Sequence, residues 1–185
     1  MSCSARDMKS EDDEFAELFD EFHPSLCRFL ECLLGGARAA AEDIAQESFL
    51  RLYRAGTDGP PQAEARFWLF RVARNLALNE LSRGHTRRRL LDRVVEMFAP
   101  QKKDPEREYE AAERRAVVME MLKLLPEQQR AALLLREQEE MSYREIAEVL
   151  CVSEAKVKVD IFRARERLRE RWGRTHSSAA GAANR

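Results

Sequence analysis

Residues 141–165 read MSYREIAEVLCVSEAKVKVDIFRAR, and they predict two short helices joined by a tight turn. Ser142 is a good N-cap residue, and Glu145 stands three positions later, which is the spacing of a capping box. Ser153 is in turn a good N-cap for the second helix. Ala147 is small enough to lie where two helices cross closely at a steep angle. We therefore expect a crossed pair of helices here.

The second of these helices has one apolar side and one polar side. Val157 and Ile161 are four residues apart and should pack against the first helix. The polar side chains that remain for a ligand are Ser153, Glu154, Lys156, Lys158, Arg163 and Arg165. This is the layout of a helix-turn-helix, whose second helix enters the major groove of DNA. A helical hairpin with a solvated charged face is the alternative; we favour DNA binding because the small residue, the turn and both caps fall in register.

Two residues fit this motif poorly. Cys151 stands in the turn where glycine is usual, which predicts strain if its backbone is left-handed. Asp160 either brings a negative charge to the DNA side of the helix or pairs with Lys156, one helical turn earlier. The sequence leaves both alternatives for Asp160 open.

A second candidate DNA-binding stretch lies upstream, where residues 65–89 read ARFWLFRVARNLALNELSRGHTRRR. Arg71, Asn75 and Asn79 recur every four residues and so share one face of a helix. Asparagine can hydrogen-bond to base edges, and Trp68 is large enough either to stack on an unpaired base or to pack in a core. The polar face continues with Arg83, Arg87 and Arg88. We expect a basic helix that binds nucleic acid.

Charge is divided into blocks along this chain of 185 residues, whose net charge is only −1. Residues 7–47 hold twelve acidic and three basic residues, a net charge of −9. Residues 66–93 hold eight basic and two acidic residues, a net charge of +6. Such separation predicts two surfaces with different partners.

The apolar spacing along the rest of the chain predicts helices only, and so an all-α fold of two small helical domains joined by a flexible linker. The first helix should end at Gly35 and Gly36, and a second helix over residues 37–55 should bury Phe49, Leu50 and Leu52. The predicted ranges are 10–92 for the first domain, 93–110 for the linker, 111–174 for the helix-turn-helix domain and 175–185 for a disordered tail.

The sequence also argues against several classes of protein. No apolar run is long enough to span a bilayer and no signal peptide opens the chain, so we expect a cytoplasmic protein without membrane insertion. The four cysteines lack the spacing of metal ligands, so we expect no metal or other cofactor. The three histidines lie far apart, without a nucleophile or a phosphate-binding motif nearby, so we expect no catalytic residue and no enzyme.

Three stretches together resemble regions of the extracytoplasmic-function sigma factors, a group within the sigma-70 family. AEDIAQESFLRLYR (residues 41–54) resembles the polymerase-binding helix of the second conserved region. Residues 65–89 resemble the helix that follows it, which melts the promoter and reads the −10 element. LPEQQRAALLLREQEEMSYREIAEVLCVSEAKVKVDIFRARERLR (residues 125–169) resembles the fourth region, which reads the −35 element. The order of the three stretches and the short linker match this group.

The resemblance implies a function, partners and site residues. The protein would direct RNA polymerase core to promoters and assist DNA melting, binding the clamp of the largest subunit, the flap of the second-largest subunit and promoter DNA, with an anti-sigma factor as a further partner and a place on the nucleoid. The surface that docks on the clamp would be Glu42, Asp43, Gln46, Glu47 and Phe49. Trp68, Arg71, Asn75 and Asn79 would read the −10 element, and Glu154, Lys156, Lys158 and Arg163 the −35 element.

The recognition helix departs from the family at one run. The family usually has Thr-Val-Lys-Ser-Arg where this chain has Lys-Val-Lys-Val-Asp at residues 156–160, so the preferred −35 sequence stays open. A conventional transcription regulator with an N-terminal helical effector or dimerisation domain is the alternative. It would explain the helix-turn-helix, but not an acidic helix followed by a helix rich in Arg and Asn.

Overall fold

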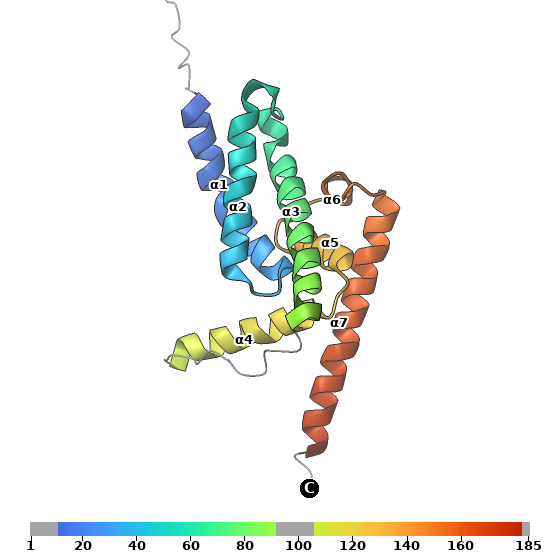
Figure 1. The fold of residues 1–185 in the computed structure, drawn as a ribbon. Coiled ribbons are helices and arrows are strands. Elements are labelled where there is room, and N and C mark those ends of the chain that lie inside the picture. Colours follow the sequence, from blue (N-terminus) through green and yellow to red (C-terminus); the bar gives the residue numbers. More distant parts are fainter. Residues whose placement is uncertain (1–10, 92–105, 183–185) are drawn as a thin grey trace, which may run out of the picture.

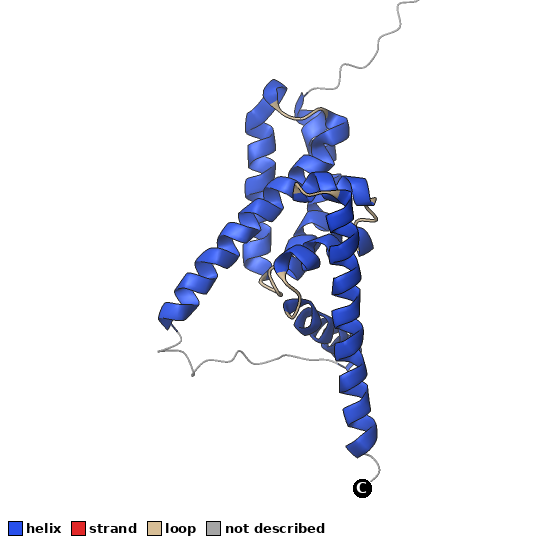
Figure 2. Cartoon of the chain, turned by 90° about the vertical axis from the view of Figure 1, so that its right-hand side faces the viewer, coloured by secondary structure: helices blue, strands red, loops and turns tan. Residues whose placement is uncertain are grey.

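The computed structural model describes residues 11–91 and 106–182, which form seven α-helices, one short 3-10 turn and no strand (Figures 1 and 2). The first domain consists of α1 (Glu11–Leu33), α2 (Arg38–Ala55), the turn η1 (Gly56–Asp58) and α3 (Gln62–Leu91). The second consists of α4 (Glu106–Lys123), α5 (Glu127–Glu137), α6 (Tyr143–Leu150) and α7 (Glu154–Ala182). The predicted all-α class and the two helical units are confirmed.

The first domain is a bundle in which α1, α2 and α3 all contact one another. Its centre is aromatic: the rings of Phe29 and Phe70 are fully buried and meet edge to face, with centroids 5.3 Å apart. Buried alanines in α2 and α3, such as Ala45 and Ala73, let the helices approach closely around these rings. The core of the bundle thus combines large aromatic side chains with small alanine side chains around them.

The turn between α1 and α2 requires glycine, as the sequence predicts. Gly35 and Gly36 have φ angles of 69° and 94°, a region that other residues rarely adopt. A Cβ atom on Gly35 would also lie 2.9 Å from Cε of Lys123 in the second domain. The turn is therefore fixed by its backbone conformation, while the flexible Lys123 side chain lies against it.

The two domains share one continuous hydrophobic core, and α5 lies at its centre (Figure 1). Residues 129–135 of α5 are all buried, because α1 packs on one side of the helix and α6 and α7 on the other. Among them is the guanidinium of Arg130, which donates to the carbonyl of Leu33 at 2.7 Å, of Leu125 at 3.1 Å and of Lys123 at 3.3 Å. Arg130 therefore caps the C-terminal end of α1 and of α4 together, and its burial lowers its pKa.

Three boundaries or orientations differ from the sequence prediction. Leu50 was expected inside but is exposed, because it lies on the side of α2 that faces away from α1 and α3. Helix α4 begins at Glu106, inside the predicted linker, while residues 92–105 lie outside the described residues. The expected tail is helical as far as Ala182, which agrees with its high alanine content.

We expect Phe70→Ala to lower the free energy of unfolding by about 3–5 kcal/mol, because it removes a fully buried ring and leaves a cavity. Urea denaturation followed by circular dichroism measures the change. Val118→Ala is the matched control, since Val118 is exposed and its truncation should change stability by less than about 0.5 kcal/mol. Equal effects of the two substitutions would contradict the position of the core.

Candidate nucleic-acid and polymerase interfaces

The capping residues predicted for the helix-turn-helix are in place. Ser142 Oγ accepts a hydrogen bond from the backbone N–H of Glu145 at 3.3 Å, and the Glu145 carboxylate accepts one from the Ser142 N–H at 2.6 Å. This backbone hydrogen bond lowers the pKa of Glu145. Ser153 Oγ likewise accepts from the backbone N–H of Lys156 at 3.2 Å. Both helices of the motif therefore begin where the sequence places them.

The apolar contacts of the motif are also as predicted. Ile146, Ala147 and Leu150 of α6 are buried, and Val157 and Ile161 of α7 are buried against the same core. The first turn of α7 is therefore fixed by packing, which a helix must have if it is to present side chains to a DNA groove.

The turn between α6 and α7 holds Cys151 in the left-handed conformation, with φ 54° and ψ 47°. Its backbone N–H donates to the carbonyl of Ala147 and so ends α6. The strain expected for a residue other than glycine is therefore present. Glu140, before α6, has the same φ of 54°, a second strained position that the sequence reading missed.

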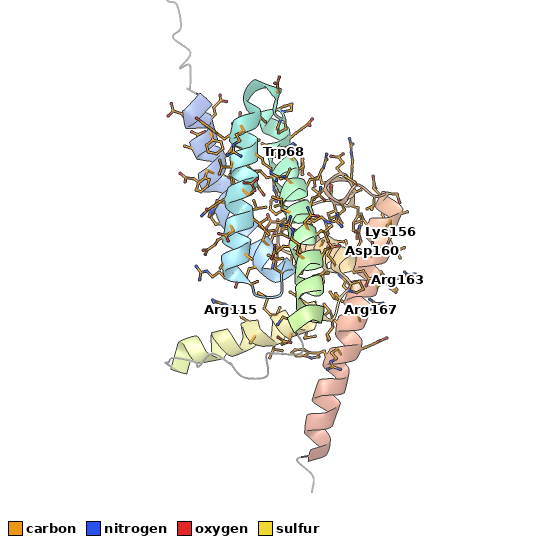
Figure 3. The ribbon with its side chains drawn as sticks, viewed as in Figure 1. Trp68, Arg115, Lys156, Asp160, Arg163 and Arg167 are labelled. Atoms are coloured by element: carbon orange, nitrogen blue, oxygen red, sulfur yellow. The ribbon has the colours of Figure 1, made fainter. Side chains whose placement is uncertain are left out.

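The polar face of α7 carries the predicted side chains. Those of Ser153, Glu154, Lys156, Lys158, Arg163 and Arg165 are all exposed. Lys156, Arg163 and Arg167 follow one another along α7 (Figure 3). Arg165 is paired with Glu137 of α5, so part of its charge is already neutralised. Lys158 and Arg163 face solvent and can meet DNA phosphates or bases.

Asp160 pairs with Lys156 rather than facing DNA, which decides between the two alternatives left open by the sequence. Its side chain is only 1% exposed, and no described residue bonds its second oxygen, Oδ2. The outer face of α7 is instead apolar at Val159 and Phe162, whose ring is 57% exposed. The sequence reading missed these two residues, although they fall between the buried positions of the helix.

The predicted −10 face lies on α3. Asn75, Asn79 and Arg83 are exposed, as expected. Trp68 is half-buried and packs against the core, so its indole can contribute to the core and still present an edge to a ligand (Figure 3). Arg71 is also half-buried, and no described residue accepts from its Nε. Arg87 and Arg88 belong to α3, but their side chains lie outside the described residues.

The predicted polymerase-binding face lies on α2 and needs one correction. Asp43 and Gln46 are exposed, and Glu42 and Glu47 are half-buried and paired with Arg38 and Arg51 of the same helix. Phe49, by contrast, is only 2% exposed. Its ring packs against α1, with its centroid 4.9 Å from that of Phe19.

Phe49 therefore holds α2 on α1 and cannot offer a surface to a partner. Leu50 and Tyr53 are the exposed apolar side chains of α2. Leu50 lies seven residues after Asp43 and so extends the same face as Gln46 and Glu47. The face that α2 presents is acidic at its start and apolar at its end.

The described ranges, 11–91 and 106–182, lack two further features. No group of three or more His, Cys, Asp or Glu side chains there could hold a metal ion. Nor does any described helix combine the length and the apolar character needed to cross a membrane.

A helical bundle with an acidic helix and a basic helix, packed on a helix-turn-helix, defines a two-domain helical DNA-binding protein. Residues 18–88 match the family profile described as Sigma-70 region 2, and residues 115–168 match Sigma-70, region 4. The chain belongs to the extracytoplasmic-function sigma factors of the sigma-70 family. It is thus a factor that directs RNA polymerase to promoters.

Individual relatives agree with this family. The RNA polymerase sigma-H factor of Pseudomonas aeruginosa is 38% identical over 139 residues, which cover 69% of this chain and 70% of the relative. The ECF RNA polymerase sigma factor SigM of Bacillus subtilis is 30% identical over 160 residues, 85% of this chain and 94% of the relative. Among solved structures, the sigma factor RpoE in complex with the anti-sigma factor NepR from Bartonella quintana shares the fold, with a TM-score of 0.65, 22% identity and coverage of 85% of this chain and 95% of that chain.

We expect Cys151→Gly to raise the free energy of unfolding by about 0.5–1 kcal/mol, because glycine adopts the left-handed conformation without a Cβ clash. Thermal unfolding of the purified protein measures the change. Cys151→Ala is the control: it removes the thiol but keeps the Cβ, and should leave stability close to that of the parent chain. If alanine stabilised as much as glycine, the thiol and not the backbone would be the source of the strain.

Proposed function

We propose that this sigma factor divides its work among three helices. Helix α2 binds the clamp of the largest polymerase subunit, α3 reads and opens the −10 element, and α7 reads the −35 element. The observation that carries the proposal is the difference between the exposed faces. Helix α2 presents Asp43, Gln46 and Leu50 beside the ion-paired Glu42 and Glu47, whereas the predicted faces of α3 and α7 present mainly amide and basic side chains. A face without excess positive charge and with an exposed apolar side chain is suited to a protein partner, and a basic surface is suited to phosphates.

The proposed polymerase surface is Asp43, Gln46, Glu47 and Leu50 on one face of α2, with Glu42 at its edge. Acidic residues beside an exposed apolar side chain suit a basic protein surface, since charge guides the encounter and apolar contact stabilises it. The second proposed contact with polymerase is between the second domain of this chain and the flap of the second-largest polymerase subunit. Both partners follow from the resemblance of these regions to those of the family.

Opening of the −10 element is assigned to Trp68, Arg71, Asn75 and Asn79 on α3. Extruding a base from the duplex costs a few kcal/mol, and contacts to the open strand must offset that cost. The exposed amides of Asn75 and Asn79 can bond to base edges, while the free edge of Trp68 can stack on an unpaired base. Arg83, Arg87 and Arg88 then extend the track for the DNA backbone.

Reading of the −35 element is assigned to the start of α7. Glu154 and Lys158 lie in its first two turns, where a recognition helix meets base edges, and Arg163 lies further along for phosphates. Lys156 is partly occupied by Asp160, so its role at DNA is weaker than that of Lys158. Compared with the usual family run, the Lys-Val-Lys-Val-Asp run thus changes the charge of α7. It still leaves basic side chains on the face proposed to bind DNA.

An anti-sigma factor is a further proposed partner of this chain. Two solved sigma factors of the same fold were each captured with such a protein: RpoE with NepR, and CnrH with the cytosolic domain of CnrY. An anti-sigma factor that covered α2 would compete directly with polymerase. With polymerase and promoter as its partners, the chain would work in the cytoplasm on the nucleoid.

Asp43→Lys combined with Glu47→Lys should abolish transcription in vitro with purified core polymerase, because it reverses the charge of the proposed docking face. Asp20→Lys combined with Glu21→Lys reverses two charges as well, both on exposed residues of α1, and should retain most activity. Circular dichroism should show both variants folded. Normal transcription by the α2 variant would contradict the proposed interface.

Trp68→Ala should retain binding to core polymerase and lose promoter opening, because it removes the stacking surface for an unpaired base. Permanganate footprinting of thymines in the promoter bubble reports opening. Trp172→Ala, which truncates the other tryptophan of the chain, should leave the bubble intact. An unchanged bubble in the Trp68 variant would restrict this residue to core packing.

A further inference from the structure

The two domains are joined by ion pairs that engage arginines of α3. Arg74 of α3 donates through Nε to Glu127 Oε1 at 3.1 Å and through Nη2 to Glu127 Oε2 at 3.2 Å. Arg66, earlier in α3, donates through Nη2 to Glu139 Oε2 at 3.3 Å. Glu127 begins α5 and Glu139 lies between α5 and α6. Each pair therefore crosses from the first domain to the second.

Arg74 is bound as a phosphate would bind it. Arg74 and Glu127 form two parallel hydrogen bonds, and a guanidinium binds a carboxylate or a phosphate with this same forked geometry. Gln128 Oε1 accepts a third bond from Arg74 at 2.8 Å, and the Glu139 carbonyl accepts one from Arg66 at 2.6 Å. Each arginine is thus surrounded by oxygen acceptors from the second domain.

Arg74 also borders the proposed −10 face. Its Nη1 lies 3.5 Å from Oδ1 of Asn75, one of the proposed base readers. Arg71 lies one helical turn earlier. The side chain that Glu127 holds is therefore close enough to the proposed strand-binding side chains to contact the backbone of a bound DNA strand.

With its two domains packed together, the chain cannot bind the −10 and −35 elements of one promoter at the same time. Elements centred near −10 and −35 lie about 25 base pairs apart, or roughly 85 Å at about 3.4 Å per base pair. A compact chain of this length has a radius of gyration of only about 16 Å. Reading both elements therefore requires the domains to separate, which breaks the contacts of Arg66 and Arg74 with the second domain.

We propose that Glu127 and Glu139 hold Arg74 and Arg66 in place of DNA phosphates, so that packing of the two domains and promoter binding along this edge of α3 exclude each other. When the domains separate on polymerase, both arginines become phosphate-binding residues beside the −10 face. This inference rests on the proposed function, because the promoter supplies the competing phosphates.

The exchange is feasible at Arg66 because its internal pair is imperfect. The Glu139 side chain is only 4% exposed, yet no described residue bonds its Oε1, and none accepts from Arg66 Nε. A buried ion pair with unsatisfied atoms offsets little of the cost of removing its charges from water. Replacing such a carboxylate with a hydrated phosphate therefore needs only a modest gain.

The first test uses RNA polymerase core bound to the Arg74→Gln variant of this chain. It measures how promoter binding by that complex depends on salt concentration. Loss of one phosphate contact should lower the slope of log affinity against log salt by about 0.7–0.9, and weaken binding at low salt. Arg28→Gln removes an exposed arginine from α1 and should keep the parent slope. An unchanged slope for Arg74→Gln would restrict Arg74 to joining the domains and overturn the proposal.

The second test uses the free chain and a short non-template −10 oligonucleotide. Glu127→Gln should tighten binding about tenfold, because it removes the charge that competes for Arg74. Glu148→Gln is the control, since Glu148 pairs with Arg144 inside α6 and its loss removes the same charge. Equal effects of the two variants, or a gain that persists when Arg74→Gln is also present, would overturn the competition.

The two tests separate this inference from the proposed function. If the parent chain gives no core-dependent promoter binding, the proposed function itself fails. If the parent chain binds promoters with polymerase and the Arg74 and Glu127 variants behave like their controls, the function stands and only the phosphate exchange is wrong.

Discussion

Helix α5 is buried from both sides, and the positions of α1, α6 and α7 depend on it. The run of buried residues from Gln129 to Leu135 leaves no solvent-facing stripe over two turns, so the helix must lie between other elements. By sequence it belongs to the second domain, before the helix-turn-helix, and by packing it belongs to a core shared with the first domain. Arg130 reinforces this position, since one guanidinium bonds to carbonyls at the ends of α1 and α4.

This packing distributes the surfaces of the molecule. Helix α2 packs against α1 and α3, so its face with Asp43, Gln46 and Leu50 stays exposed. Helix α3 presents two polar faces. Arg66 and Arg74 face the second domain, while Asn75 and Asn79 face solvent. The recognition helix α7 uses one side to pack and the other to present Lys158 and Arg163. A surface for a protein partner and two surfaces for DNA thus coexist on one small chain.

The features that could be predicted from the sequence are local ones. Capping boxes, glycine turns and apolar spacing act over a few residues, so the caps and buried positions of the helix-turn-helix and the Gly35–Gly36 turn were predicted correctly. On α3 the exposure of Asn75, Asn79 and Arg83 agrees with the prediction, and the basic face as a whole stays a prediction. The spacing of α2 predicts that both Phe49 and Leu50 are buried, and the packing of α1 leaves only Phe49 inside. The resemblance placed Phe49 on the docking face, and its burial against α1 contradicts that role.

The remaining features depend on distant partners. Arg130 bonds to a carbonyl 97 residues away and Arg66 to a carboxylate 73 residues away, so no local pattern marks either contact. The ion pair between Asp160 and Lys156 was one of two alternatives that the sequence left open. The burial of the Asp160 side chain, by contrast, follows from the packing of α7.

Promoter binding with and without core polymerase measures the central claim most directly. A labelled duplex promoter is titrated with the purified chain, first alone and then with core enzyme. In this account the chain binds polymerase through α2 and binds DNA only after its two domains separate. It should therefore bind the promoter weakly alone and tightly with core enzyme. Tight duplex binding by the chain alone, unaffected by added core, would contradict that account.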